Sequence, residues 1–415
     1  MLYWCKNFEV GMNKNYFRRM TFQSALLAVF LVFAAKGFAQ YTNGIYAEFN
    51  TSMGGYTCAL YYAQAPKAVG SFIGLASGQR AWLDLPSGVV KTNPFYNGIL
   101  FHRVITNFVI QAGSPNGLGT DGPGYTFVDE ITNSLRFDSF GVLAMANSGP
   151  DSNGSQFFIT ASPQPGLNDG YTIFGRLYGG SNVVYAINHV ATDTNSKPLV
   201  SVYINSIAIR RVGSAANAFD INAQGLPLVT NLDLAIAKSD TNVSITFSNQ
   251  LYADNRLFAS SNLFNWKADP LGIETAAPVS NSILQSAAAP AQFYRGAQIQ
   301  YAASTRAPKS WSGKTLTFFY TNGLVATNIL VFNGSGGGTY IYTTNAPGTI
   351  LGYNWYQGIY NGRMLPIGFS GLADQAMVLH FSKTNAGSFN GGVYPFGYPI
   401  SALAFAISGT FTNSP

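Results

Sequence analysis

Two short apolar runs carry polar side chains of the kind that bind ligands. The first run, FHRVITNFVIQ at residues 101–111, sets Arg103 among aromatic and β-branched neighbours. The second, NGSQFFI at residues 153–159, sets an amide beside two phenylalanines. Both runs are typical of strands bounded by glycine and proline turns. Because a guanidinium is rarely buried without a partner, we expect Arg103 at the lip of an apolar pocket, held by a neighbour such as Gln111.

Residues for other common chemistries are absent or badly spaced. The three histidines are scattered without the spacing of metal ligands: His102, His189 and His380. No G-x-S-x-G nucleophile elbow occurs. Asp121 and Asp151 lie in loops rich in Gly, Asn and Ser, where carboxylates usually shape turns. Residues 117–122 match G-x-G-x-x-G, but Pro123 follows, which indicates a surface loop rather than a dinucleotide site.

Four segments, in order, resemble the cyclophilin-type peptidyl-prolyl cis-trans isomerases: FHRVITNFVIQAG, GTDGPGYTFVDE, GVLAMANSGPDSNGSQFFIT and LNDGYTIFGRL. The resemblance covers about residues 44–212, a little under half of the chain. It implies a mainly β fold, with a cyclophilin-like closed eight-stranded antiparallel β-barrel and two helices in this part. It also implies an isomerase of X-Pro bonds in proline-containing polypeptides, with no cofactor and no metal.

The implied reaction needs a hydrogen-bond donor and a pocket rather than a nucleophile. Rotation about a peptide bond has a barrier of about 18–20 kcal/mol, because the nitrogen lone pair is delocalised into the carbonyl. Twisting the bond localises that lone pair on the prolyl nitrogen. A hydrogen bond to the nitrogen is then stronger in the transition state than in the ground state, which is differential binding by a preorganised group.

The resemblance assigns roles to particular residues. Arg103 is the donor to the prolyl nitrogen, and Gln111 orients its guanidinium. Asn147 holds the substrate backbone through its own main chain, with Ala146 beside it, and Gln156 has a more structural role. The proline pocket is walled by apolar residues, Phe108, Val109, Phe158 and Leu167. Each of these, taken alone, is also compatible with an ordinary core.

Two positions at the pocket rim depart from the commonest family pattern. Gly166 stands where many members carry a tryptophan, and Tyr171 where many carry a histidine. These departures leave open the affinity for cyclosporin-type ligands and the substrate preference, but not the isomerisation step.

The local patterns predict the elements that position these residues. Residues 45–49 and 56–61 form a hairpin, because a glycine turn separates them. A helix runs from Lys67 to Ala76, since Pro66 precedes it and Gly78 follows it. A second short helix spans 183–190, and a closing strand spans 200–210.

At 415 residues the chain is too long for one ordinary domain. We expect one or two additional all-β modules after the isomerase domain, because alternating runs continue to the end of the chain. The predicted parts are a signal peptide with an N-terminal extension, the isomerase domain, a linker, a small β module and a C-terminal all-β sandwich or barrel: 1–39, 40–212, 213–227, 228–300 and 301–415.

The composition bears on compartment and partners. Most of the formal net charge of +6 lies in residues 1–39, where Arg18 and Arg19 precede an apolar run. This pattern predicts a secretory signal peptide cleaved after Ala39, with an uncleaved anchor as the alternative and Met12 or Met20 as possible true starts. Cleavage would leave Cys58 alone, a buried small hydrophobe without a disulfide.

We therefore expect an exported isomerase that assists folding in the periplasm, at the cell surface or outside the cell. The remaining basic residues form no stripe, so no nucleic-acid partner is expected. No segment of the mature chain is apolar enough to span a membrane. The alternative is a proline-peptide-binding or adhesion scaffold with incidental catalysis. Oligomeric state, physiological substrates and the ligand of residues 228–415 stay open.

Overall fold

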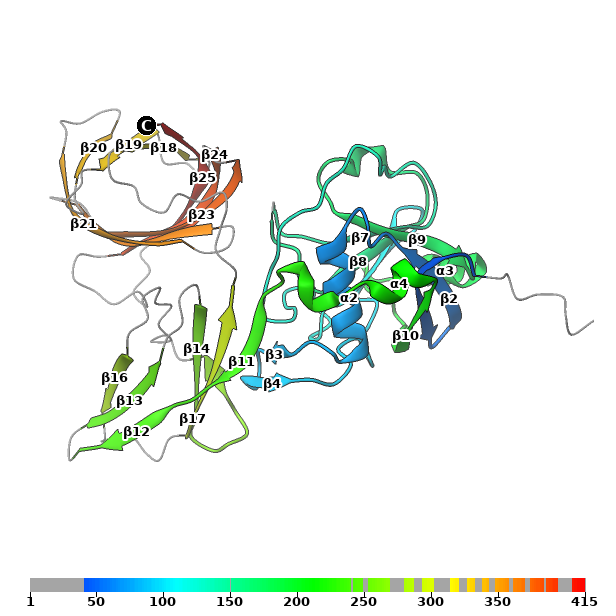
Figure 1. Ribbon diagram of the computed structural model, residues 1–415, viewed down its shortest axis with the longest axis horizontal. Coiled ribbons are helices and arrows are strands. Elements are labelled where there is room, and N and C mark those ends of the chain that lie inside the picture. Colours follow the sequence, from blue (N-terminus) through cyan, green and yellow to red (C-terminus); the bar gives the residue numbers. More distant parts are fainter. Residues whose placement is uncertain are drawn as a thin grey trace, which may run out of the picture. The chain divides into compact units, whose positions relative to one another are not determined.

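A computed structural model gives the fold of the chain (Figure 1). The structure describes residues 41–149, 151–239, 242–248, 253–268, 280–286 and 293–301, and then 314–320, 327–332, 338–342, 348–357, 361–369, 374–383, 386–394 and 405–414. The predicted signal peptide lies outside the described residues. Within them, no helix has the length and apolar character needed to cross a bilayer.

The first domain, which contains the four motif segments, is built on one curled antiparallel sheet of eight strands, in the order β10-β1-β2-β9-β7-β8-β6-β5. Its strands are β1 (Gly44–Thr51), β2 (Gly54–Leu60), β5 (Arg103–Ile105), β6 (Val109–Ala112), β7 (Val142–Met145), β8 (Phe157–Thr160), β9 (Ile173–Gly179) and β10 (Ile204–Val212). The predicted hairpin is present, since Ile45 pairs with Leu60 and Thr51 with Gly54. The predicted fold class is confirmed.

The two ends of this sheet meet through a short seam rather than a full ladder. Phe101 N donates to Val202 O at 2.8 Å, and Ile204 N donates to Ile99 O at 2.9 Å. These bonds and the isolated Leu100–Tyr203 bridge join the segment before β5 to the start of β10, the strands at the two ends of the sheet order.

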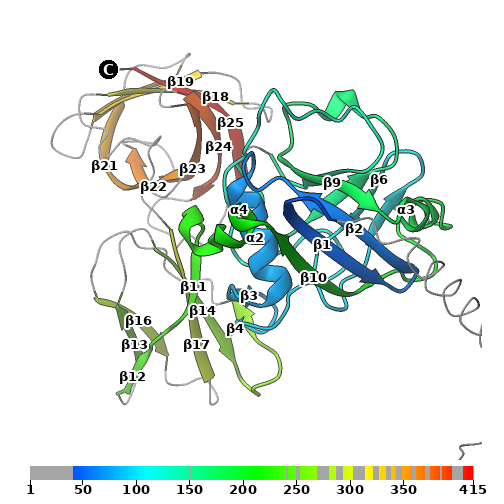
Figure 2. The ribbon, with the colours of Figure 1, turned by 45° about the vertical axis from the view of Figure 1, so that its right-hand side comes forward.

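Both predicted helices are present, as α2 (Pro66–Ser77) and α3 (Ser181–Asn188). Pro66 occupies the first turn of α2, and Gly78 ends the helix in the left-handed conformation, with φ of 70°. Helix α2 packs beside β10, and α3 contacts β2 and β6 (Figure 2). The segment 213–227, predicted as a linker, contains α4 (Ser214–Ala218) and the 3-10 helix η2 (Ile221–Gln224).

The sheet buries a different apolar cluster on each face because side chains alternate along a strand. On β8, Phe157 lies in the main core, where its ring contacts Phe72 of α2 at 5.8 Å between centroids. The next residue, Phe158, belongs to a smaller cluster on the opposite face and stacks on Phe137 at 5.7 Å. On β6, Ile110 likewise lies in the main core and Val109 in the smaller cluster.

A small hairpin and a β module complete the middle of the chain. The hairpin consists of β3 (Trp82–Asp84) and β4 (Val89–Lys91). The module has a four-stranded sheet, β11-β17-β14-β15, and a three-stranded sheet, β12-β13-β16. Its strands are β11 (Leu228–Leu232), β12 (Ala235–Lys238), β13 (Asn242–Ser248), β14 (Ala253–Ser260), β15 (Lys267–Ala268), β16 (Ser280–Ser286) and β17 (Phe293–Gln300).

The C-terminal part is a closed barrel in which each strand pairs with its neighbours in sequence, and β18 pairs with β25. Figure 1 shows its strands as a ring. They are β18 (Thr315–Tyr320), β19 (Thr327–Phe332), β20 (Gly338–Tyr342), β21 (Gly348–Gln357), β22 (Asn361–Phe369), β23 (Asp374–Lys383), β24 (Ala386–Tyr394) and β25 (Phe405–Ser414). Of the two architectures expected for residues 301–415, the structure has the barrel.

Candidate active site

The pairing of β5 with β6 brings Arg103 opposite Gln111. The guanidinium Nη1 donates to Gln111 Oε1 at 3.2 Å. Arg103 is half-buried, and among the described residues no carboxylate lies within ion-pair distance of it. Its other guanidinium donors therefore remain available to a ligand, because the side chain carries five N–H groups.

A chain of amides fixes Gln111 in turn. Gln111 Nε2 donates to Gln156 Oε1 at 3.1 Å. Gln156 Nε2 then donates to the carbonyl oxygens of Gly119 and Asp121, at 3.0 and 2.9 Å. The orientation of the guanidinium is thus linked to the loop between β6 and β7, and Gln156 acts through this loop.

The apolar floor next to Arg103 is the smaller cluster of the sheet. Phe158 is 4% exposed, and the Tyr171 ring meets it edge-on at 5.4 Å between centroids. Phe108 and Leu167, from the β5–β6 turn and the 3-10 helix η1 (Pro165–Leu167), pack against the same cluster. These side chains together present an apolar surface next to Arg103.

Asn147 and Ala146 follow β7 and form one side of the hollow. Asn147 Nδ2 donates to Gly170 O at 2.9 Å, and its Oδ1 accepts from Gly149 N at 3.3 Å. No described residue bonds the main-chain N–H or C=O of Asn147. That main chain can therefore pair with an extended peptide, as one strand pairs with another.

These residues surround a hollow of about 400 Å³, which we call the proline hollow. It brings together every residue that the sequence assigned to the site: Arg103, Phe108, Val109, Gln111, Ala146, Asn147, Phe158, Leu167 and Tyr171. Three further lining residues were not predicted: His102, Leu118 and Gly119. Leu118 is 70% exposed, which is unusual for a leucine beside an apolar floor.

His102 is the lining residue that sequence reasoning could have found, because it directly precedes Arg103. Its ring is 7% exposed, and neither ring nitrogen has a hydrogen-bond partner among the described residues. Burial lowers its pKa from the usual 6.5, and the positive charge of Arg103 acts in the same direction against the opposing carboxylate of Asp121. The lowered pKa favours the neutral form of His102 beside the guanidinium.

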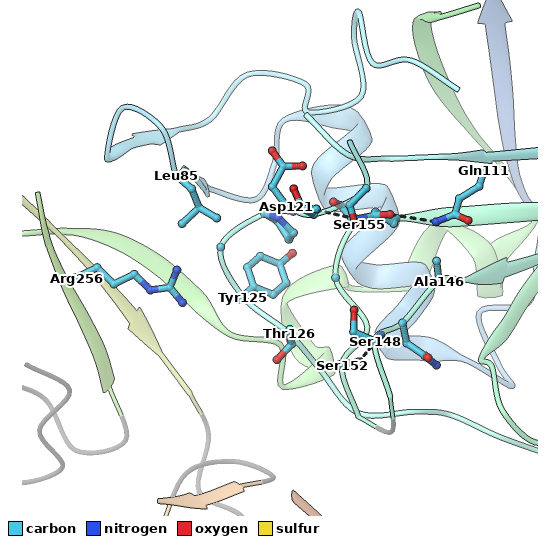
Figure 3. A pocket seen from close by; sticks show the side chains of 18 of the residues that line it. Leu85, Gln111, Asp121, Tyr125, Thr126, Ala146, Ser148, Ser152, Ser155 and Arg256 are labelled. Atoms are coloured by element: carbon cyan, nitrogen blue, oxygen red, sulfur yellow. Dashed lines mark hydrogen bonds between the residues drawn. The ribbon is translucent and has the colours of Figure 1, made fainter. Parts of the chain in front are cut away.

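A second hollow, of about 370 Å³, adjoins the first (Figure 3). The two share Gln111, Gly119, Ala146 and Asn147. The second hollow is lined mainly by polar loop residues, which include Thr120, Asp121, Ser148, Ser152 and Gln156, and Arg256 of β14 also lines it. A peptide chain that crosses the shared residues would place side chains in both hollows.

Two loops that border both hollows are fixed by carboxylates. Asp121 accepts from Ser114 Oγ at 2.5 Å and from Asn116 N at 2.9 Å, so it folds its own loop back. Asp151 Oδ1 accepts from Asp129 N at 2.9 Å, and Asp151 N donates to Asp129 Oδ2 at 2.9 Å. Both predicted turn-shaping carboxylates thus bond loop backbone.

Taken together, the site offers a preorganised donor beside an apolar hollow and a main chain that can pair with peptide. Electrostatic stabilisation by a fixed donor requires no covalent step. The arrangement suits a reaction in which an apolar ring is held while a hydrogen bond strengthens at an adjacent atom.

Comparison with known proteins agrees with this arrangement. Residues 46–209 match the model of the family described as cyclophilin type peptidyl-prolyl cis-trans isomerase/CLD. Peptidyl-prolyl cis-trans isomerase A of Mycobacterium tuberculosis is 46% identical over 165 residues, which is 39% of this chain and 91% of that protein. Peptidyl-prolyl cis-trans isomerase B of Streptomyces anulatus is 46% identical over 170 residues, which is 40% of this chain and 96% of that protein.

The chain is also similar to a solved structure, that of a Cryptosporidium parvum cyclophilin type peptidyl-prolyl cis-trans isomerase in the presence of the dipeptide ala-pro. It is 33% identical, covers 40% of this chain and 99% of that chain, and has a TM-score of 0.36. Since most of the length of two curated isomerases aligns here at 46% identity, this chain belongs to the cyclophilin-type peptidyl-prolyl cis-trans isomerase family.

Proposed function

We propose that the isomerase domain speeds X-Pro isomerisation in exported polypeptides and so assists their folding. The observation that carries the proposal is the Arg103 guanidinium, fixed by Gln111 at the edge of the proline hollow. X-Pro isomerisation takes tens to hundreds of seconds without a catalyst, and it is slow enough to limit folding.

In the proposed mechanism, the pyrrolidine ring lies on the floor formed by Phe158 and Leu167. The main chain of Asn147 holds the residues that flank the proline. As the bond twists, the lone pair localises on the prolyl nitrogen, and Arg103 donates a hydrogen bond to it. Because this bond strengthens only in the twisted state, it lowers the barrier instead of merely tightening binding.

The test measures how fast the full chain isomerises an X-Pro peptide. Exchange NMR gives this rate directly, without a coupled protease. Arg103→Ala should lower kcat/KM by about 100-fold, the loss typical for removal of one transition-state donor. The kcat/KM of Arg103→Lys should lie between those of the parent and Arg103→Ala, because lysine keeps the charge but loses the planar guanidinium.

Arg210→Ala is the matched control, because Arg210 is bonded to Glu48 at 2.5 Å and does not line the proline hollow. It should keep the parent rate. Full activity in Arg103→Ala, or none in the parent, would contradict the mechanism.

The export part of the proposal rests on the basic and apolar pattern of residues 1–39. It is tested by N-terminal sequencing of the protein purified from its native cells. A mature chain that begins at Gln40, outside the cytoplasmic fraction, is expected. A cytoplasmic protein that retains residues 1–39 would refute export and leave the isomerase assignment intact.

A further inference from the structure

The second hollow contains a residue that does not belong to the isomerase domain. Arg256 of β14 lines it, together with Tyr301, which follows β17. Figure 3 shows the Arg256 side chain extending from its strand toward Tyr125. Among the residues that the structure describes, Asp121 is the only other charged residue that lines this hollow. The origin and surroundings of Arg256 therefore decide what the hollow can bind.

Alternation along β14 explains why Arg256 faces the isomerase domain. Leu257 points into the core of the β module, where it packs with Ile245 and Phe247. Its neighbours Arg256 and Phe258 point to the opposite face. Phe258 is 1% exposed and belongs to the main core of the isomerase domain. The face that carries Arg256 is thus the face that packs on that domain.

Strand β17 extends the same packed face. Its residues Ala297 and Arg295 lie opposite Arg256 and Phe258 in the β14–β17 register. Ala297 is fully buried in the main core, and Arg295 Nη1 donates to Ser87 O at 3.0 Å. These contacts surround Arg256 along and across the sheet, so its backbone position is fixed.

Glycine at position 88 allows this close approach. Gly88 has φ of 66°, and a Cβ added there would collide with the Phe258 ring. The β3–β4 turn thus provides a flat surface on which the Phe258 face rests. The same turn supplies the Ser87 carbonyl that Arg295 bonds.

The guanidinium of Arg256 keeps donors for a ligand. Its Nε and Nη2 donate to Asp254 Oδ2, at 3.3 and 3.1 Å, and no other described residue accepts from it. Because an arginine has five N–H groups, others point to no described partner. Asp121, the other charged residue of the described lining, carries a carboxylate, and like charge disfavours an anion beside it. Arg256 is therefore the charged group of this hollow best able to bind an incoming anion.

The two hollows are close enough for one peptide to occupy both, since they share Gln111, Ala146 and Asn147. Successive Cα atoms are about 3.8 Å apart, so a side chain within about three residues of the proline can reach the second hollow.

We propose that Arg256 makes the enzyme prefer substrates that carry an aspartate or glutamate within about three residues of the isomerised proline. The carboxylate would enter the second hollow and accept charge-assisted hydrogen bonds from the guanidinium. This inference rests on the proposed isomerase function and specifies its substrate class.

The test uses the full chain and a peptide series with one X-Pro bond. Glutamate, glutamine or lysine is placed in turn at each of the three positions on either side of the X-Pro pair. At one position, kcat/KM for glutamate should exceed that for glutamine by about five- to tenfold, and lysine should be poorest. The ratio should fall as salt is raised, because screening weakens a partly exposed charge pair.

Arg256→Gln should bring the glutamate-to-glutamine ratio close to one, and Arg256→Glu should favour the lysine peptide. Arg256→Lys should keep part of the preference, which provides a conservative variant if the others fold poorly. Lys238→Gln removes a positive charge from exposed strand β12 and should keep the parent ratio.

The outcomes separate this inference from the function on which it rests. A parent enzyme that isomerises all peptides without favouring glutamate at any position overturns the Arg256 assignment and leaves the isomerase. An equal ratio in the parent and in Arg256→Gln also overturns it. Absence of isomerisation with every peptide refutes the proposed function itself.

Discussion

Two eight-stranded antiparallel sheets in the described part of the chain are connected differently. In the C-terminal barrel every strand pairs with its neighbours in sequence, and the first strand pairs with the last. In the isomerase domain the order is β10-β1-β2-β9-β7-β8-β6-β5, so strands far apart in sequence lie side by side. This order places Phe158 of β8 next to Gln111 of β6 and thereby assembles the proline hollow.

An eight-stranded sheet does not by itself form a binding site. The loops between the isomerase strands, residues 113–141 and 146–156, supply Gly119, Asn147 and the amide of Gln156. We expect some residues of the isomerase domain to serve both stability and activity, and the C-terminal barrel provides the reference for stability alone.

The largest effect is expected from Phe158→Ala. Phe158 is 4% exposed and stacks on Phe137, so truncation should lower the free energy of unfolding by about 3–5 kcal/mol. It should also lower isomerase activity, because the same ring forms the floor of the hollow. Phe318→Ala is the matched change, since Phe318 is fully buried in β18. It should destabilise the barrel similarly, and hydrogen exchange of the full chain would locate each loss. If Phe158→Ala kept the parent activity, the Phe158 ring would not be needed for isomerisation.

A smaller effect is expected from Gln111→Leu, which keeps the side-chain bulk and removes the bond to Arg103. The guanidinium would lose its fixed orientation, and kcat should fall by about tenfold, the order expected for a modest misplacement of a catalytic group. KM should change less, because the floor stays in place. Gln64→Leu, at an exposed position, should keep the parent values. An unchanged kcat in Gln111→Leu would show that Arg103 needs no orienting partner.

The smallest effect concerns pH. Burial lowers the pKa of His102 from 6.5, so the unfolded chain binds more protons than the folded chain just below that value. The stability of the isomerase domain should be complete above pH 6.5 and should fall as the pH drops through the lowered pKa. His102→Phe should flatten this dependence in denaturant titrations, whereas His189→Gln, at an exposed position, should retain it. The same slope in His102→Phe would contradict the assignment.

The sequence was most informative where side chains and partners are close along the chain. The pair Arg103 and Gln111 is eight residues apart, and one hairpin brings its members together. The α2 boundaries followed from Pro66 and Gly78, because their backbone preferences act locally. The rest of the site, including Phe158 and Tyr171, followed from family resemblance, since no periodicity reports which strands pair.

Two features could not be predicted from local pattern. Leu118 lines the hollow because hydrogen bonds among Ser114, Asn116 and Asp121 shape its loop, and such a network leaves no periodic signal. Arg256 lies 47 residues beyond residue 209, where the family match ends. Tertiary packing, such as that of Phe258 on Gly88, places it at the second hollow. The helices within residues 213–227 were missed because Ala- and Asn-rich composition is also typical of linkers.

Strand β8 turns Phe157 toward the main core and Phe158 toward the smaller cluster beneath the proline hollow. Inserting or deleting one residue within it would exchange the two rings and ruin both surfaces at once. We therefore expect insertions and deletions to be tolerated in the loops and appended modules but not within β8. New ligand preferences would then arise in those loops and modules.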